Sequence, residues 1–146
     1  MSLGKACAEG DYDQAIQLIR EENNLEEQVE YSHRKWKFTD KPVRKCTPLI
    51  IASSEGYVDI VRALLGAGAD VDAEDTLLRR TVLHYACELG HLRIVRVLLD
   101  NGSKPNKTDD FNLTPLMLAI ITGYEAVALE HISQTCLLYT SDAADE

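Results

Sequence analysis

The sequence predicts an all-α fold, a solenoid of stacked helix–turn–helix units, and two observations support this prediction. A segment that begins with threonine recurs along the chain: Thr47 to Thr81 is 34 residues, and Thr81 to Thr114 is 33. Glycines follow these threonines with nearly the same step. A unit of this length is too small to bury its own apolar face, so a fixed period predicts units that stack and share one core.

The residues within one unit predict two short helices. Thr47 can cap the first helix, and Pro48 suits its first turn. Gly56 ends that helix, because a residue without Cβ adopts the left-handed conformation easily. The second helix carries apolar pairs one turn apart over residues 60–65, which give it one apolar face, and Gly68 closes it. The equivalent glycines in the later units are Gly90, Gly102 and Gly123.

The three segments resemble the ankyrin repeat: TPLIIASSEGYVDIVRALLGAGADV from Thr47, TVLHYACELGHLRIVRVLLDNGSKP from Thr81 and TPLMLAIITGYEAVALEHI from Thr114. The resemblance covers roughly residues 2–133 and implies an ankyrin-repeat solenoid with β-hairpin fingers between the helix pairs. The first unit lacks the T-P-L-H motif and is more polar, as is typical of a terminal repeat that acts as a cap. The units are expected at about residues 2–25, 46–75, 80–109 and 113–135.

An insertion, residues 26–45, separates the first two units, and the alternation from Val29 to Phe38 predicts that it forms one extended β-finger. Several Lys and Arg residues and the chain's one Trp lie in it. Two interpretations remain open: a solvated finger whose aromatic side chains rest on its neighbour, or a basic, aromatic surface for an acidic partner. A variant of the second is nucleotide or nucleic-acid binding, with Trp36 or Phe38 stacked on a base.

Composition limits the class of protein. The formal net charge of −9 argues against general nucleic-acid binding. The N-terminus lacks the pattern of a signal peptide, and the longest apolar stretch, around residues 116–121, is too short to insert across a membrane. Four scattered cysteines do not indicate a disulfide framework. We expect an intracellular, cytoplasmic protein, with the nucleus as an alternative.

Two short patterns have the spacing of metal sites, but the repeat explains both. His84, Cys87 and His91 have a spacing that zinc ligands can have, yet the resemblance implies structural roles for both histidines and a small core residue at position 87. The acidic run 70–75 lacks the glycine and the glutamate of a calcium loop. Motifs of nucleotide-binding enzymes and hydrolases are absent. We therefore expect no catalytic residue, no metal and no cofactor.

The resemblance implies that the chain binds another protein, as a scaffold or adaptor, through the concave surface of inner helices and fingers. Several residues expected on that surface are apolar, which suggests a binding surface; the alternative is that the apolar fingers pack on one another. The expected partner-binding residues are Arg34, Lys35, Trp36, Phe38, Arg44, Ser54, Glu55, Leu77, Leu78, Arg80, Glu88, Leu89, Phe111, Leu113 and Ile121. A further alternative is the substrate-recruiting repeat region of a larger enzyme or signalling protein.

The last residues, CLLYTSDAADE (136–146), resemble the translation of a transposase-type sequencing adaptor. We therefore expect residues 136–146 to be a non-native tail; the alternative is a genuine acidic tail. The second helix of the last unit is expected to end near Ile132. The last unit is also expected to expose an apolar face around Val127 and Ile132.

Overall fold

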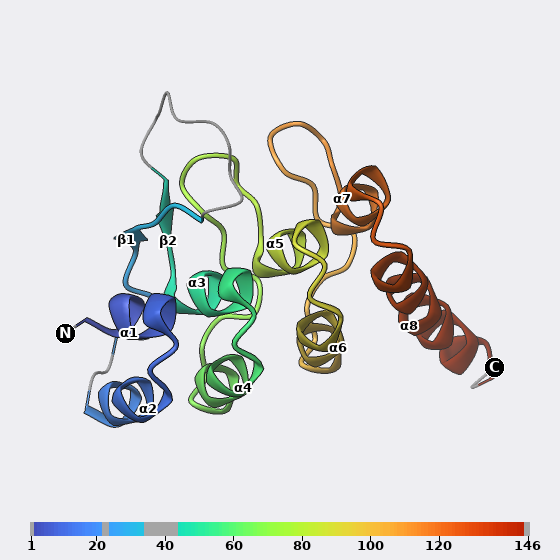
Figure 1. The fold of residues 1–146 in the computed structure, drawn as a ribbon. Coiled ribbons are helices and arrows are strands. Elements are labelled where there is room, and N and C mark those ends of the chain that lie inside the picture. Colours follow the sequence, from blue (N-terminus) through green and yellow to red (C-terminus); the bar gives the residue numbers. More distant parts are fainter. Residues whose placement is uncertain (1, 22–23, 34–43, 145–146) are drawn as a thin grey trace.

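The computed structural model describes residues 2–21, 24–33 and 44–144, with side chains up to residue 135. Its helices pair within each unit and form two rows, with α1, α3, α5 and α7 in one row and α2, α4, α6 and α8 in the other (Figure 1). This arrangement confirms the predicted all-α repeat solenoid. The helix pairs are α1 (Leu3–Glu9) with α2 (Tyr12–Glu21), α3 (Pro48–Glu55) with α4 (Val58–Gly66), α5 (Val82–Glu88) with α6 (Leu92–Asp100), and α7 (Pro115–Thr122) with α8 (Glu125–Ala144).

Threonine caps and left-handed glycines set the boundaries of the helices, as the sequence predicts. The Thr47 hydroxyl accepts a hydrogen bond from the backbone N–H of Ile50, and Thr114 does the same for Met117. Gly56 has a φ of 89° at the turn into α4. The glycines at positions 10, 68, 90, 102 and 123 also have positive φ.

The segments between the helix pairs form the fingers. Strand β1 (Val29–Glu30) pairs antiparallel with β2 (Lys45–Cys46), which confirms the base of the predicted β-finger. Neighbouring fingers are hydrogen-bonded through their backbones. The N–H of Thr76 donates to the carbonyl oxygen of Lys45 at 3.2 Å, and the N–H of Asp110 donates to that of Leu78 at 2.9 Å. The fingers therefore form one connected surface.

Two fingers turn at residues other than glycine. Arg79 has a φ of 55°, and Asn112 has a φ of 59°. Arg79 adopts the left-handed conformation itself, although the Cβ of an L-residue disfavours it.

The core runs along the stack between the two rows, from Leu3 in the first unit to Val127 in the last. Both of these side chains are buried, with exposed fractions of 0% and 2%. The expectation that Val127 lies on an exposed end face was therefore wrong. Val127 occupies the position of Ile60 and Ile94, which are also buried against the inner row.

Helix α8 differs from the prediction in length. It continues to Ala144 instead of ending near Ile132. Residues 125–144 contain neither glycine nor proline, so no residue in the segment stops the helix.

Candidate partner-binding surface

The finger segments 44–46, 76–80 and 109–113, together with the C-terminal ends of α3, α5 and α7, form what we call the inner surface (Figure 1). Most of the predicted partner-binding residues lie on it or directly beneath it. The predicted residues Arg34, Lys35, Trp36 and Phe38 lie outside the described residues. The other eleven predicted residues lie within the described part of the chain.

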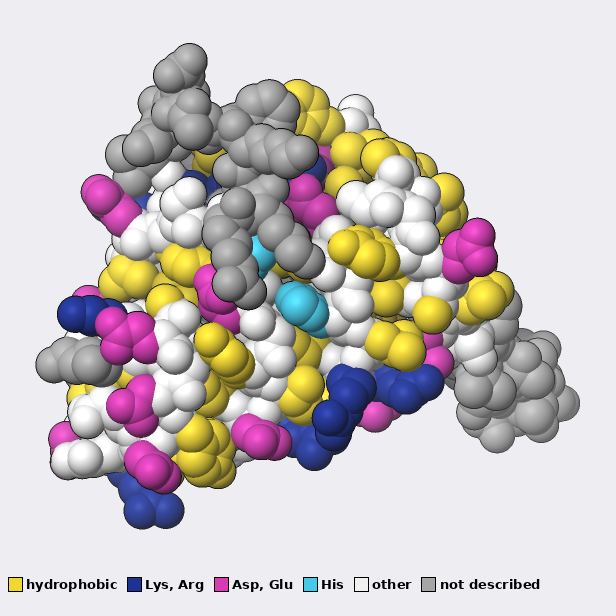
Figure 2. Space-filling view, in the orientation of Figure 1, with side chains coloured by type: hydrophobic (Ala, Val, Ile, Leu, Met, Phe, Trp, Pro, Cys, Tyr) yellow, Lys and Arg dark blue, Asp and Glu magenta, His cyan; other side chains and the backbone are white. Residues whose placement is uncertain are grey.

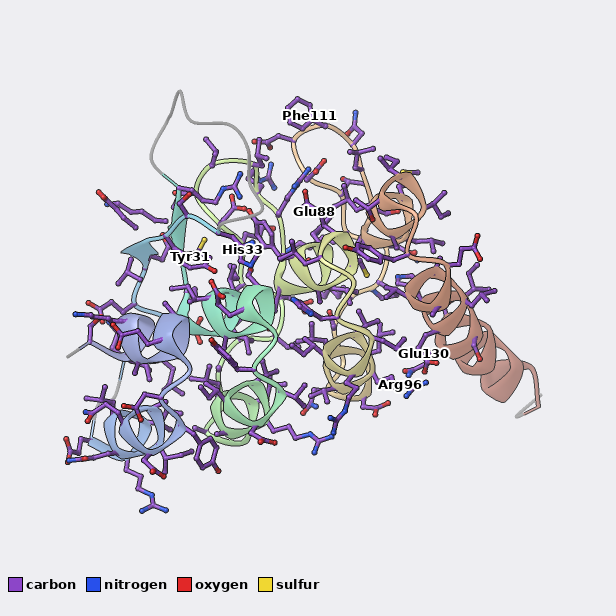
Figure 3. All side chains as sticks on the ribbon, in the orientation of Figure 1. Tyr31, His33, Glu88, Arg96, Phe111 and Glu130 are labelled. Atoms are coloured by element: carbon purple, nitrogen blue, oxygen red, sulfur yellow. The ribbon has the colours of Figure 1, made fainter. Side chains whose placement is uncertain are left out.

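Exposed apolar side chains gather at the C-terminal half of the inner surface. Phe111 is 65% exposed and Ile121 is 67% exposed. Leu77, Leu78 and Leu113 are partly buried. Figure 2 shows hydrophobic side chains over α7 and the finger before it, and Figure 3 places Phe111 at the tip of that finger. This half of the surface offers an apolar contact area.

Three of the predicted residues are buried. Ser54 has no exposed surface, Leu89 is 6% exposed and Arg80 is 9% exposed. Their positions on the inner helices and finger follow the repeat, but their side chains point into the packing between units. In this structure their side chains are buried beneath the inner surface and are not available for contact with a partner.

Arg80 links a carboxylate on α5 to one at the start of the finger before α7. Its Nε donates to Asp109 at 3.0 Å, and its Nη1 donates to Glu88 at 2.9 Å. Burial alone would lower the pKa of Arg80, but Glu88 and Asp109 raise it. Burial raises the pKa of Asp109, and the N–H of Leu113 and the Arg80 guanidinium overcome that effect and lower it. The group is therefore an ion pair network at neutral pH.

Two aspartates shape the fingers. Asp75 accepts hydrogen bonds from the N–H groups of Leu77 and Leu78, both at 2.8 Å. Asp109 accepts from the N–H groups of Phe111 and Leu113, both at 2.9 Å. These bonds hold the backbone of the apolar finger residues in place. The sequence reading did not identify this pair, although the 34-residue step from Asp75 to Asp109 equals the period of the repeat.

Glu55 lies at the other end of the inner surface, where the extended finger meets α3. The hydroxyl of Tyr31 donates to Glu55, and the Nε2 of His33 lies 4.0 Å from its second oxygen. Burial raises the pKa of Tyr31, and the bond to Glu55 adds to the rise. Tyr31 and His33 project from the finger above α3 (Figure 3). Glu55 is only partly exposed, and these contacts hold it in place.

Arg44 rests on an aromatic ring rather than projecting as a free charge. Its guanidinium carbon lies 5.5 Å from the ring centroid of Tyr85. The Tyr85 hydroxyl in turn donates to Asp75. Burial and the Asp75 carboxylate raise the pKa of Tyr85, so the phenol stays neutral. This contact joins the extended finger to α5 and to the next finger.

The histidines and the cysteine of the zinc-like spacing have structural partners. The Nδ1 of His84 accepts from the N–H of Thr81 at 3.0 Å, and its Nε2 donates to the carbonyl oxygen of Leu113 at 2.8 Å. The Nε2 of His91 donates to the carbonyl oxygen of Ser54 at 2.9 Å. Burial raises the pKa of Cys87 to about 12. Across the described residues, no three His, Cys, Asp or Glu side chains are grouped as metal ligands would be.

Comparison with known proteins agrees with this architecture. The mouse protein "Ankyrin repeat and SOCS box protein 16" is 40% identical over 83 residues, which is 57% of this chain and 18% of that protein. "L-asparaginase" of Dirofilaria immitis is 40% identical over 68 residues, 47% of this chain and 11% of that protein. "E3 ubiquitin-protein ligase KEG" of Arabidopsis thaliana is 40% identical over 65 residues, 44% of this chain and 4% of that protein.

The chain thus spans less than a fifth of the length of these relatives. None of the helices in the described part of the chain has the length and hydrophobicity needed to cross a bilayer. The family model for ankyrin repeats (3 copies) matches residues 3–109 and 49–133, which together cover nearly all of the helix pairs described above. The chain therefore belongs to the ankyrin-repeat family.

Proposed function

We propose that this chain is a scaffold or adaptor module that holds another protein on its inner surface. The observation that carries the proposal is the exposed apolar group around Phe111 and Ile121, beside partly exposed Leu78. Ankyrin repeats are protein-interaction modules, which supports binding in general. The position on the inner surface is our inference.

The fingers suit this role because they are ordered before a partner arrives. The Asp75 and Asp109 carboxylates fix the backbone at Leu77, Leu78 and Phe111. The bond from the N–H of Asp110 to Leu78 ties the two apolar fingers together. A surface that is already rigid loses little conformational entropy on binding, so more of the contact energy appears as affinity.

Specificity in this proposal comes from an apolar centre and a charged margin. Phe111 supplies an aromatic anchor, and anchors of this kind dominate many interfaces. Glu88 lies on α5 next to the apolar fingers (Figure 3), where Arg80 holds it in one orientation. We therefore expect a partner with an apolar side chain for the Leu78–Phe111 region and a hydrogen-bond donor for Glu88. The basic segment with Trp36 and Phe38 would extend this contact, as the sequence predicts.

The test is affinity capture with the full chain and quantitative mass spectrometry, comparing the wild type with a Trp36→Ala, Leu78→Asp, Phe111→Ala variant. Proteins that bind the inner surface should be lost by the variant. The matched control is Tyr12→Ala, which removes an aromatic ring that is 48% exposed on the outer helix α2. Equal recovery of the same proteins by the wild type and the triple variant would contradict the assignment of the surface.

A second candidate function is the substrate-recruiting repeat region of a larger enzyme or signalling protein. The observation that favours it is the small share of the relatives that this chain spans, 18% or less, in proteins whose names include an asparaginase and an E3 ubiquitin-protein ligase. The inner surface would then bind the substrate, and chemistry would occur elsewhere. Nothing in the described residues forms a catalytic group, and we propose no catalytic activity for the repeats.

We also propose that residues 136–146 are a non-native, adaptor-derived tail, on the resemblance of CLLYTSDAADE to a translated adaptor. Resequencing the source transcript across the codon for Thr135 tests both this tail and the second candidate. New coding sequence after Thr135 supports the adaptor origin, and a catalytic domain within it supports the second candidate. The same eleven codons followed by a stop codon would contradict the adaptor origin.

A cytoplasmic location is part of the proposal. Its support is the state of the thiols of Cys7, Cys46 and Cys87, which are buried and free. Burial raises the pKa of each of them to about 12, so they behave as small apolar core residues. Fractionation of cells that express the tagged chain tests the location.

A further inference from the structure

The last helix pair has an apolar face that the first three pairs do not leave open. Met117 is 46% exposed and Ile120 is 61% exposed, both on α7. Ile132, on α8, is 42% exposed. We call these three residues the end face. Helices α7 and α8 pack on α5 and α6, and within the described residues they end the two rows of helices (Figure 1).

The repeat shows what normally covers these positions. Counted from the turn glycine, Met117 is equivalent to Ile50 and His84, and both of these have exposed fractions of 0%. In the same way, Ile120 is equivalent to Cys7, Ser53 and Cys87, which all have exposed fractions of 0%. Of these residues, His84 contacts the unit that follows, since its Nε2 donates to the carbonyl oxygen of Leu113 at 2.8 Å. Continuity with that interface therefore identifies the end face as one side of another interface.

The turn glycines give an independent sign of the same kind. A Cβ at Gly10 would lie 2.5 Å from the ring of Tyr57, and one at Gly90 would lie 2.5 Å from the ring of Tyr124. At Gly56 the nearest atom would be in the ring of His91, at 3.0 Å. Each ring comes from the unit that follows. Gly123 has the same left-handed backbone, with a φ of 82°, but no atom lies within 4 Å of its Cβ position.

We propose that the end face binds one further ankyrin-type helix pair, which buries Met117 and Ile120 and places an aromatic or imidazole ring over Gly123. The required chemistry is specific. The residue after the turn glycine of the new unit must carry a ring, as Tyr57, His91 and Tyr124 do in theirs. Its first helix must present apolar side chains to α7, as α7 does to α5. This inference does not depend on the partner proposed for the inner surface.

The neighbouring Leu129 marks the boundary of the interface. It is 67% exposed, but its equivalents are the exposed residues Arg62 and Arg96 of α4 and α6. Those arginines remain exposed although a following unit is present. Arg96 nevertheless forms an ion pair with Glu130 of the following unit, with its Nε 3.1 Å from the carboxylate, so Leu129 lies at the margin of the proposed contact.

The test adds one further unit, which is built from this chain's own sequence. Residues 101–133 are repeated once after Ser133 in the full chain, which keeps the 33-residue step and supplies Tyr124 again as the ring for Gly123. A reporter thiol replaces Ile120 of the original unit, in a Cys136→Ser background. Ile120→Cys reproduces the natural Cys87 at the equivalent position. The rate of alkylation of this thiol is compared in the chains with and without the added unit.

We expect the added unit to slow alkylation at position 120 by about tenfold or more, because labelling then requires local opening. Alkylation at position 12, measured with Tyr12→Cys in the first helix pair, should not change, because Tyr12 is 48% exposed at the other end of the stack. Replacing the added copy of Tyr124 with Ala should restore part of the labelling at position 120. An unchanged rate at position 120 in the extended chain overturns the proposal.

A second copy of this chain is the competing occupant, and sedimentation velocity of the unextended chain distinguishes it. A monomer across the concentrations used for labelling supports the repeat as the occupant. A dimer whose formation protects position 120 would overturn it in favour of the second copy. Circular dichroism of the thiol variants shows whether each has folded. If Ile120→Cys does not fold, Ile120→Ser, which copies Ser53, replaces it in the sedimentation experiment.

Discussion

The imidazole of His91 lies over Gly56 of the preceding unit and donates a 2.9 Å hydrogen bond from its Nε2 to the carbonyl oxygen of Ser54. Tyr57 and Tyr124 cover Gly10 and Gly90 in the same way. Each ring is the first residue after a turn glycine, so the residue that directly precedes the second helix also packs on the unit before. The contact joins neighbouring units at the turns, and Tyr57 and Tyr124 also pack against the edge of the apolar core.

The first prediction concerns the space that the glycine leaves for the ring. Gly90→Ala should destabilise the chain by about 2 kcal/mol, because the left-handed backbone is strained with a Cβ and the methyl group would meet the Tyr124 ring at 2.5 Å. Urea unfolding followed by circular dichroism measures the change. The loss should appear in the midpoint with little change in slope.

Gly102→Ala is the matched control for this prediction. Gly102 has a φ of 83°, but nothing lies within 4 Å of its Cβ position. The Gly102→Ala variant should lose only about 1 kcal/mol of folding stability, because only the left-handed backbone opposes the added Cβ. Equal losses for Gly90→Ala and Gly102→Ala would show that the ring adjusts freely and that the stacking contact contributes little.

The second prediction concerns the ion pair network beneath the inner surface. Arg80→Met should destabilise the fold by about 3 kcal/mol, because it leaves the Asp109 carboxylate, 4% exposed, without its cation. Arg79→Met is the control, since Arg79 is exposed and its ion pair with Glu74, at 3.5 Å, is at the surface. It should change stability by less than about 0.5 kcal/mol.

The double variant Arg80→Met, Asp109→Asn separates the ion pair from the finger geometry. An asparagine oxygen can still accept from the N–H groups of Phe111 and Leu113, so the finger keeps its shape. The double variant should therefore lose less than the sum of the two single variants, by about 1 kcal/mol or more. Strict additivity in urea unfolding would mean that the two side chains do not interact.

The repeat predicted the helix pairs, the caps and the turns because each depends on a local pattern that recurs. Threonine is a common helix cap and glycine a common turn residue, so the residue types of Thr47 and Gly56 predict their roles. The 33- to 34-residue step then locates the equivalent residues in the other units. The same logic predicted that residues 26–45 are an insertion, and the β1–β2 pair confirms its base. The family was therefore recognisable from the sequence.

The inner surface was harder to predict because exposure depends on neighbours distant in sequence. Ser54 and Arg80 stand at positions where ankyrin repeats usually make contacts, but adjacent units cover them. The roles of Asp75 and Asp109 were not predicted, because they depend on backbone N–H groups that only the folded finger turns towards the carboxylates. The exposed apolar face was predicted around Val127 and Ile132. Ile132 is 42% exposed, but Val127 is buried because it faces the inner row, and Met117 and Ile120 supply the rest of the face.

The third prediction concerns His131, a polar residue in a position that is otherwise apolar. Its equivalents are Leu64 and Leu98, and it is 2% exposed. Neither ring nitrogen forms a well-aligned hydrogen bond with any described residue. A buried polar group whose hydrogen bonds are poorly aligned lowers stability. His131→Leu should therefore stabilise the chain at pH 7.5 by about 1 kcal/mol, measured by urea unfolding.

The fourth prediction is the pH dependence that the same residue produces. Burial lowers the pKa of His131 in the folded state, and the backbone carbonyl of Pro105 opposes this only in part. Burial also lowers the pKa of His84, whose Nδ1 must stay unprotonated to accept from the N–H of Thr81. Below about pH 6.5 the unfolded chain therefore binds protons that the folded chain does not. Stability is fully present above that pH and falls as the pH drops towards the lowered folded values.

Urea unfolding at pH 7.5 and pH 5.5 measures this loss in the wild type and in His131→Leu. The leucine variant should lose less on acidification, and the difference between the two proteins should widen by up to about 1.4 kcal/mol per pH unit below 6.5. His84 remains in the variant, so part of the dependence should persist. A wild type and a variant that lose the same stability would mean that His131 is not the group that resists protonation, and His84, which is bonded at both ring nitrogens, would then account for the loss.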